Sequence, residues 1–541
     1  KHEANTYYHG SQILLKTSDM GKTWKEVSPD LTRNDKSKQG KPGVPYTNEA
    51  VGAENYGTLA YVMESVHEKG VIYTGSDDGL VHVTKDGGAT WKNITPTGLA
   101  ECLINAIEVS PHDKATVYIA TTRYKFDDHT PSLFKSTDYG NTWTKINTGI
   151  APNAFTRVIR EDNVVKDLLF AGTELGVYIS KNGGKNWTPF QLNLPLTPIT
   201  DLRVHQNNLI ASTSGRSFWI LDDLNLIRQY KTDTMNVNLY QPQSTVISTG
   251  YGYSELDYNS NEFKGAKSSG GVNPATGLVL YYQLPTIADS VDLKLDIKNA
   301  TGKIVRSFSS KANSKKTTLS KSKGLNRFVW NLKHETVSSI PNVFIESSFS
   351  GHTAIPGTYT VHLMVGDKEY KTNASLTASP DLTTNVSEHK LYDSIMSHME
   401  STVTEMHDMV NELKNKSGIV EDLIKKLKTD DTFKEAKYTG LLKNAQDLLT
   451  SLKNWDEDMI QRKSTSYDDV ENFPNKFTAN YMFLMNQTEN DIFQVNQPSL
   501  DLLKTYTAEW EKLKARGLSL KNEQIPALNK QLWEIGMGVI W

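Results

Sequence analysis

With 541 residues, the chain is too long for a single hydrophobic core, and several domains are expected. A formal net charge of −3 provides no basic field for a phosphate backbone, so a nucleic-acid partner is disfavoured. The sequence has no run of 18 apolar residues, which argues against a membrane-spanning helix, and its single cysteine excludes an internal disulfide and a zinc site built on several thiolates.

The first 230 residues contain a repeated eight-residue pattern, Ser/Thr-x-Asp-x-Gly-x-Thr-Trp. Copies at residues 17–24, 84–91 and 136–143 are intact, and a copy at 180–187 carries Asn in place of both Asp and Thr. A structural role is assigned to the Asp or Asn, the Gly and the Trp of each copy, namely Asp19, Gly21, Trp24, Asp86, Gly88, Trp91, Asp138, Gly140, Trp143, Asn182, Gly184 and Trp187.

These residue types are typical of a turn between two strands. Asp or Asn caps backbone N–H groups, Gly adopts a positive φ, and Trp begins the next strand and is expected to pack into the blade core beneath the turn. The pattern is the Asp-box of bacterial-neuraminidase-type repeats, and its recurrence predicts β-propeller blades of four strands. A fifth unit keeps the strands without the box. Five blades do not close a ring well, and an open array leaves an unpaired strand edge at each end. We therefore expect an incomplete ring whose upstream blades are missing.

Several runs of the sequence resemble a known family. They are residues 28–35, 75–80, 171–176 and 215–223. They resemble the large sortilin-like, Asp-box-repeat proteins exported by Gram-negative bacteria, which are often labelled glycosyl hydrolases. The resemblance implies that this chain corresponds to the C-terminal half of such a protein and that it lies outside the cytoplasm, at the cell surface, with the outer membrane or in the periplasm. Ser214 stands where the family usually has His.

Two further domains are predicted after the propeller, which is assigned to residues 1–239. Residues 240–380 are assigned to a linker, rich in Ser, Gly and Asn, and to an immunoglobulin-like β-sandwich, because apolar and polar residues alternate there. Its strands are expected at residues 278–284, 291–298, 304–308, 326–332, 358–365 and 369–377.

Residues 381–541 are assigned to an α-helical bundle. After residue 380 the apolar period changes from 2 to 3.6, with one apolar stripe from Leu391 to Leu413. Further helices are expected at about 419–428, 434–462, 499–516 and 522–535. His398 and His407 are interpreted as surface residues. The predicted fold class is therefore multi-domain and mainly β: a partial β-propeller with Asp-box repeats, then an immunoglobulin-like β-sandwich, then an α-helical bundle.

The common catalytic motifs are missing from the sequence. It contains no His-Glu-x-x-His, no Gly-x-Ser-x-Gly, no phosphate-binding Gly-rich loop ending in Lys-Ser/Thr and no calcium loop. Its thirteen histidines show no metal-ligand spacing. The sequence therefore predicts neither a metal site nor a cofactor.

A ligand-binding face is predicted from the repeat alignment. The turn after the second strand of each repeat lies on the face opposite the Asp-boxes, and the longest insertions, 29–56 and 124–132, fall on that face. The alternative is that the polar residues of these turns serve solvation alone. The candidate ligand-binding residues are Gln12, Asp77, Arg123, Glu174, Ser214 and Arg216.

The sequence leaves two functions open. The favoured one is a scaffold that binds protein or peptide partners, such as a surface or outer-membrane complex or a chain that completes the propeller. The alternative is a sialidase-like glycoside hydrolase acting on surface or extracellular glycans. Sialidases of this fold use an arginine cluster, a Tyr/Glu pair and an acidic Asp. The candidates for these roles are Arg123 and Arg216 for the arginine cluster, Glu54 and Tyr56 for the pair, and Asp77 for the acid. No spacing in the sequence enforces this assignment.

Overall fold

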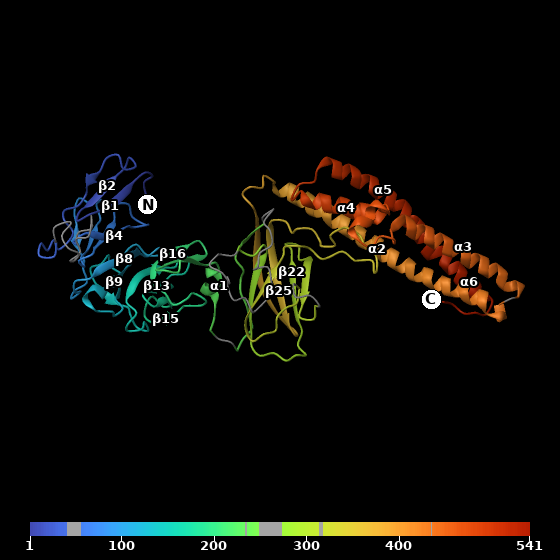
Figure 1. The fold of residues 1–541 in the computed structure, drawn as a ribbon, viewed down its shortest axis with the longest axis horizontal. Coiled ribbons are helices and arrows are strands. Elements are labelled where there is room, and N and C mark those ends of the chain that lie inside the picture. Colours follow the sequence, from blue (N-terminus) through green and yellow to red (C-terminus); the bar gives the residue numbers. More distant parts are fainter. Residues whose placement is uncertain (40–55, 233–234, 248–272, 313–316, 434, 541) are drawn as a thin grey trace. The chain divides into compact units, whose positions relative to one another are not determined.

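The computed structural model describes residues 1–541 except 40–55, 233–234, 248–272, 313–316, 434 and 541 (Figure 1). The described residues form two compact units, 1–230 and 231–541. The predicted fold class is confirmed: the first unit is a partial β-propeller, and the second combines two further sheets with helices. Residues 248–272 of the predicted linker and the candidate Glu54 lie outside the described residues.

The propeller unit contains five antiparallel sheets in its described part, which we call blades 1 to 5 in chain order (Figure 1). Blade 1 comprises β1 (Tyr7–Gly10), β2 (Leu14–Thr17) and β3 (Lys25–Glu26). Blade 2 comprises β4 (Leu59–Glu64), β5 (Ile72–Ser76), β6 (Val81–Thr84) and β7 (Lys92–Asn93). Blade 3 comprises β8 (Leu103–Val109), β9 (Val117–Thr122), β10 (Leu133–Ser136) and β11 (Thr144–Lys145).

Blades 4 and 5 complete this unit. Blade 4 comprises β12 (Thr156–Glu161), β13 (Leu169–Thr173), β14 (Gly176–Ser180) and β15 (Thr188–Pro189). Blade 5 comprises β16 (Ile199–His205), β17 (Asn208–Thr213) and β18 (Phe218–Leu221), and the short helix α1 (Leu224–Gln229) follows it. The predicted order of four strands is confirmed in blades 2, 3 and 4.

The first strands of blades 2 to 5 are joined by one buried arginine. Arg160 on β12 pairs with Asp201 of β16 at 2.7 Å and lies 3.6 Å from Glu108 of β8. Its guanidinium also donates to the Tyr61 hydroxyl of β4 at 3.0 Å and to the Leu202 carbonyl at 2.8 Å. A buried guanidinium needs several acceptors, and here they come from neighbouring blades, so the ion pairs hold the blades together.

Each Asp-box is closed by its own side chains. In blade 2, Oδ1 of Asp86 accepts the backbone N–H of Thr90 at 2.9 Å and the Thr84 hydroxyl at 2.8 Å. Oδ2 of Asp86 accepts the Thr90 hydroxyl at 2.6 Å. In the degenerate copy, Asn182 accepts the Asn186 N–H at 3.0 Å, so the amide preserves the main bond of the turn.

Three of the four Asp-box tryptophans pack in or against a blade core, as the sequence predicted, and Trp24 does not. The indole N–H of each of the three bonds to the preceding blade: Trp91 to the Val27 carbonyl at 2.9 Å, Trp143 to Ile94 at 2.6 Å, and Trp187 to Ile146 at 2.6 Å. Gly88, with φ of +105°, lies so close to Val27 that a Cβ would overlap its carbonyl oxygen. The box therefore joins neighbouring blades. Trp24 of blade 1 has no preceding blade among the described residues and is 45% exposed, which corrects its placement in a blade core.

The second unit begins with a β-sandwich. One sheet has the order β19 (Asn238–Leu239), β21 (Leu278–Leu284), β24 (Gly324–Trp330). The other has the order β20 (Thr245–Ile247), β26 (Lys368–Ala378), β25 (Gly357–Val365), β22 (Leu293–Lys298), β23 (Ile304–Ser309). Phe328 packs on Phe308 and Trp330 on Tyr359, which joins the two sheets. The immunoglobulin-like character of this sandwich stays a prediction.

The helices follow the sandwich (Figure 1). They are α2 (Val386–Thr429), α3 (Ala436–Met459), α4 (Phe477–Asn490), α5 (Gln497–Ser519) and α6 (Ile525–Glu534). Sandwich and helices share one continuous core, in which Trp330 of β24 and Met399 of α2 are both buried. The predicted limits at 239 and 380 stay predictions, because the described structure separates two units and not three.

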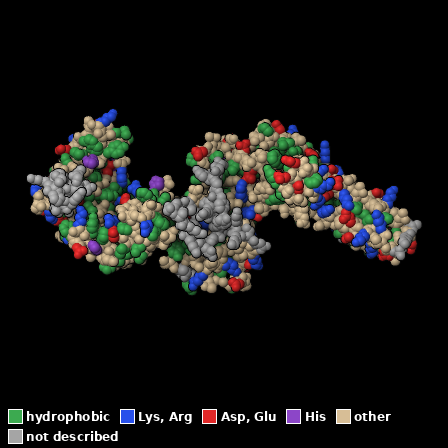
Figure 2. Space-filling model, viewed as in Figure 1, with side chains coloured by type: hydrophobic (Ala, Val, Ile, Leu, Met, Phe, Trp, Pro, Cys, Tyr) green, Lys and Arg blue, Asp and Glu red, His purple; other side chains and the backbone are tan. Residues whose placement is uncertain are grey.

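Two predictions for the helical part are wrong, and one helix was not predicted. The stretch 419–428 is the end of α2 and not a separate helix, since Val420, Leu423 and Leu427 continue its buried stripe. The helix α4 was missed. His407 is fully buried and contacts the Ser338 carbonyl at 2.5 Å, so it is not a surface residue. Within the described ranges, every helix is too short or too polar to cross a bilayer, and basic and acidic side chains intermingle on the helical part in Figure 2.

Candidate functional site

The turns after the second strands of the blades share a backbone pattern. The N–H of Asp77 donates to Thr58, that of Glu174 to Phe155 and that of Ser214 to Pro198, at 2.9, 3.0 and 2.9 Å. In each case the acceptor immediately precedes the first strand of the same blade. The three positions are therefore geometrically equivalent, at the ends of the strands opposite the Asp-boxes. Gln12 and Arg123 lie in the corresponding turns of blades 1 and 3.

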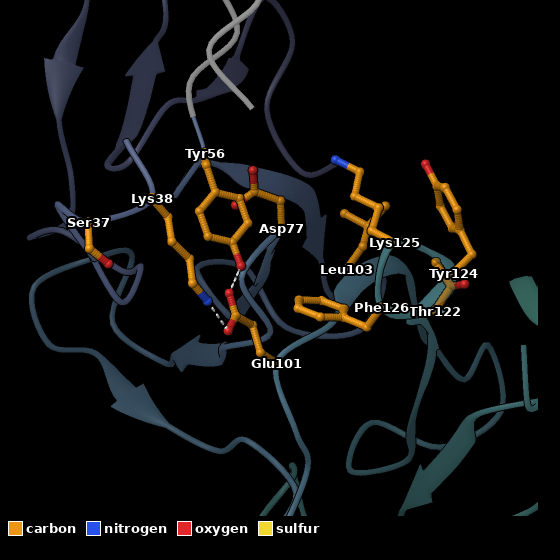
Figure 3. Close-up of a pocket in the computed structure, with 10 residues that line it drawn as sticks. All are labelled: Ser37, Lys38, Tyr56, Asp77, Glu101, Leu103, Thr122, Tyr124, Lys125 and Phe126. Carbon is orange, nitrogen blue, oxygen red and sulfur yellow. Dashed lines mark hydrogen bonds and ion pairs between the residues drawn. The ribbon is translucent and has the colours of Figure 1, made fainter. Parts of the chain in front are cut away.

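A cavity of about 270 Å³ opens on this face between blades 2 and 3 (Figure 3). Two of the candidate residues, Tyr56 and Asp77, line it. The insertion after blade 1 contributes Ser37 and Lys38, and the blade 3 insertion contributes Tyr124, Lys125 and Phe126. Both long insertions thus meet at one cavity.

Glu101 forms the ionic centre of the cavity. Its carboxylate accepts the Tyr56 hydroxyl and pairs with the Lys38 ammonium (Figure 3). Its backbone carbonyl accepts Nη1 of Arg123 at 2.6 Å. Sequence reasoning missed Glu101, because it lies in the connection between blades and has no counterpart in the repeat. The one available signal was a charged residue in a Leu-Ala-Glu-Cys-Leu run that is otherwise apolar.

The Asp77 carboxylate accepts hydrogen bonds from the backbone just before the first strand of its own blade. Oδ1 accepts the N–H groups of Gly57 and Thr58 at 3.0 and 2.9 Å. Burial raises the pKa of Asp77, and these hydrogen bonds oppose the rise. The neighbouring Asp78 is buried and accepts the Arg33 N–H at 2.7 Å. The two aspartates therefore anchor the insertion after blade 1 to the cavity wall.

The other charged candidates are also paired. Nε of Arg123 bonds to Asp128 within the blade 3 insertion at 3.1 Å. Glu174 receives two bonds from Arg157, at 2.9 and 2.7 Å. These pairs shape the loops and leave the rim of the cavity to Tyr124, Lys125 and Phe126.

The remaining candidates do not join the cavity. Gln12 is exposed in blade 1, where its carbonyl accepts the Leu31 N–H at 3.0 Å. Ser214 and Arg216 are exposed in the blade 5 turn, and Arg216 bonds to the Gly215 carbonyl at 3.1 Å. Arg123 and Arg216 thus come from different turns, and the described lining of the cavity contains no arginine. Glu54 lies outside the described residues.

Comparison with known proteins identifies the propeller segment. Residues 79–191, from the second-strand turn of blade 2 to the end of blade 4, match the Sortilin-Vps10 family model, described as sortilin or neurotensin receptor 3. This confirms the sortilin-like resemblance over these blades. No curated protein sequence matches the chain.

Solved structures resemble the chain weakly. A GH74 xyloglucanase from Xanthomonas campestris is 14% identical over 68% of this chain and 57% of its own, with a TM-score of 0.33. An ancestral GH74 enzyme is 12% identical over 69% and 45%, with a TM-score of 0.29. YCF48 from Cyanidioschyzon merolae is 14% identical over 43% and 70%, with a TM-score of 0.26. The chain spans about half the length of the two GH74 enzymes, and at these TM-scores the similarities carry no argument about function.

Proposed function

We propose that this chain, with its sortilin-type blades at residues 79–191, binds a protein partner by inserting an extended segment of that partner into the cavity between blades 2 and 3. The observation that carries the proposal is the difference between the inner wall of the cavity and its rim. Its inner charges are already paired, whereas its rim presents an exposed aromatic pair, Tyr124 and Phe126, around Lys125. Such a rim suits recognition better than catalysis.

The rim residues define the chemistry of the partner. Tyr124 and Phe126 are 41% and 47% exposed, and aromatic residues of this kind are enriched at protein interfaces. The ring of Tyr124 stacks on Phe155 at 5.5 Å, so it is held in place before a partner arrives. A cavity of about 270 Å³ is large enough for one or two side chains. The preferred segment carries an apolar side chain for Phe126 and Leu103 beside a carboxylate for Lys125.

A location outside the cytoplasm belongs to the same proposal. It is supported by the match of blades 2 to 4 to a sortilin-type model and by the family resemblance of the sequence. A surface or outer-membrane partner complex follows from that location.

The binding proposal is tested with a displayed random peptide library selected on the full chain. Selected peptides are expected to combine an aromatic or aliphatic residue with Asp or Glu. Phe126→Ala and Lys125→Glu should each weaken their binding about tenfold or more, which corresponds to roughly 1.4 kcal/mol. The matched control is Lys185→Glu, an exposed lysine in an Asp-box, which should leave binding unchanged. Equal losses in the control and the rim variants would contradict the proposal.

A glycosidase is the second candidate, favoured by one observation. The Tyr56 hydroxyl donates to Glu101 in the same cavity that Asp77 lines. Sialidases use a tyrosine nucleophile. In that assignment Tyr56 attacks the anomeric carbon and transfers its proton to Glu101, while Asp77, whose pKa burial raises, protonates the leaving oxygen. Glu101 replaces Glu54 as the partner of the tyrosine.

The two candidates are separated by turnover of aryl sialosides and other aryl glycosides. The binding proposal predicts no saturable hydrolysis, because Lys38 already neutralises Glu101 and the described lining offers no arginine for a substrate carboxylate. Saturable hydrolysis that disappears in Glu101→Gln and persists in Glu174→Gln would establish the glycosidase instead.

A further inference from the structure

Two histidines and an aspartate from three separate segments meet in the second unit. His334 follows β24, His352 precedes β25, and Asp393 lies near the start of α2. The backbone brings the histidines together, because the N–H of His334 donates to the carbonyl of His352 at 2.9 Å beside an isolated bridge between Lys333 and Thr353. Their imidazole rings lie against each other, with centroids 3.8 Å apart.

The ligand atoms of the three side chains converge. Nε2 of His352 lies 3.1 Å from Oδ1 of Asp393, and Nε2 of His334 lies 3.8 Å from the same oxygen. All three ligand atoms lie within 4.8 Å of one another. Metal–ligand bonds of roughly 2.0–2.2 Å place the ligands of a tetrahedral zinc ion roughly 3.3 Å apart. The observed separations therefore bracket the spacing that zinc requires.

His334 supplies an independent observation. Its Nε2 is buried and finds no hydrogen-bond partner among the described residues, since Asp393 at 3.8 Å is too distant. Leaving a buried polar atom unpaired destabilises a fold, so such atoms are rare. A cation between His334 and Asp393 would satisfy it.

Glu400 orients the second histidine. Its Oε1 lies 2.8 Å from Nδ1 of His352 and accepts the backbone N–H of His352. With Nδ1 facing Glu400, Nε2 faces Asp393. A carboxylate behind an imidazole is the usual outer partner of a metal-bound histidine. Together Asp393 and Glu400 bring two negative charges to the histidine pair, which a divalent cation balances.

We propose that His334, His352 and Asp393 bind one divalent transition-metal ion, with zinc preferred, and that water or a ligand group completes its coordination. Two imidazoles and one carboxylate with an open position form a donor set that zinc favours. The His352 side chain is fully buried, that of His334 is 12% exposed and that of Asp393 is 33% exposed. The open coordination position therefore faces solvent beside Asp393. The site is distinct from the propeller cavity, and its partners lie far apart in the sequence, which is why the sequence predicted no metal.

The test measures zinc binding to the chelator-treated full chain by titration calorimetry and by metal analysis after dialysis. One zinc ion per chain is expected, with a rise in the melting temperature on binding. Asp393→Asn and His334→Ala should each abolish the bound ion and the temperature rise. Glu400→Gln should weaken binding about 10- to 100-fold.

The matched control is His362→Ala. His362 also pairs with a carboxylate, Glu369, at 2.6 Å, but it lies on β25 outside the cluster. This variant should keep the full stoichiometry. Cobalt added in place of zinc reports the site directly, because a tetrahedral nitrogen–oxygen site gives intense visible absorption that Asp393→Asn removes. The absence of bound zinc in the wild type, or equal binding by all four variants, overturns the proposal even if His334→Ala fails to fold.

Discussion

At the scale of single residues, the Asp-box tryptophans illustrate how context changes the role of a repeated residue. Trp187 is 2% exposed and bonds to the preceding blade, whereas Trp24 at the same repeat position is 45% exposed. Trp187→Ala should lower the free energy of unfolding by about 3–5 kcal/mol, because it removes a buried indole and leaves a cavity. Trp24→Ala should cost less than about 1 kcal/mol. Denaturant unfolding of both variants measures the difference, and equal losses would contradict the blade-to-blade role of the box.

A second residue-scale prediction concerns acid stability. The side-chain and backbone hydrogen bonds from Thr90 lower the pKa of Asp86 to about 2. The folded-state pKa is thus below the unfolded value, so the contribution of Asp86 to stability is present above about pH 4 and is lost as the pH falls towards 2. We expect Asp86→Asn to flatten the fall in stability between pH 4 and 2.

The degenerate copy provides the matched control for Asp86. Asn182 occupies the same position without a titratable group. Asn182→Asp should therefore make the acid transition steeper. Carboxyl NMR of Asp86 that gives an ordinary pKa would show that its hydrogen bonds do not persist in solution.

At the scale of elements, the first strands of the blades depend on Arg160 and its partners. Burial raises the pKa of Glu108 on β8 to about 7, and the attraction of Arg160 opposes the rise. The folded-state pKa is above the unfolded value, so folding is favoured most below about pH 4 and stability falls as the pH rises through 7. Where the folded state holds one proton more than the unfolded state, the free energy of unfolding falls by about 1.4 kcal/mol per pH unit.

Glu108→Gln should remove this slope. Urea unfolding of wild type and variant between pH 5 and 8 provides the measurement, with Glu174→Gln on the exposed face as the control. An identical slope in wild type and Glu108→Gln would mean that the carboxylate is not desolvated between the strands.

At the scale of the whole molecule, sandwich and helices should fold together. Lys333 pairs with Glu489 of α4, and His407 of α2 packs on Phe349, so both halves of unit 231–541 complete each other's core. We expect the fragment 231–541 to unfold in one cooperative transition. The fragment 231–380 should be markedly less stable, because Tyr392 and Met396 of α2 would no longer cover it. Circular dichroism at both helix and strand wavelengths tests this, and two separate transitions would favour the predicted limit at 380.

Local patterns determined much of the architecture. Periods of 2 and 3.6 and the Asp-box predicted the strands and the long helices, because alternation and turn chemistry depend on neighbouring residues. The strands predicted at 278–284 and 358–365 correspond closely to β21 and β25. The same patterns identified the face that bears both insertions. The break before 419 was wrong because a single Ser-Gly pair does not outweigh a continuous apolar stripe.

Tertiary structure decided which side chains meet. Glu101 contacts Tyr56 and Lys38 because two loops from different blades close on one cavity. His334, His352 and Asp393 meet because two loops and a helix pack together. Contacts of this kind involve residues far apart in the chain and obey no period. A single sequence therefore specifies the elements and their buried faces directly. The pairing of charges, and the partner that each tryptophan finds in the preceding blade, follow only once those faces have packed.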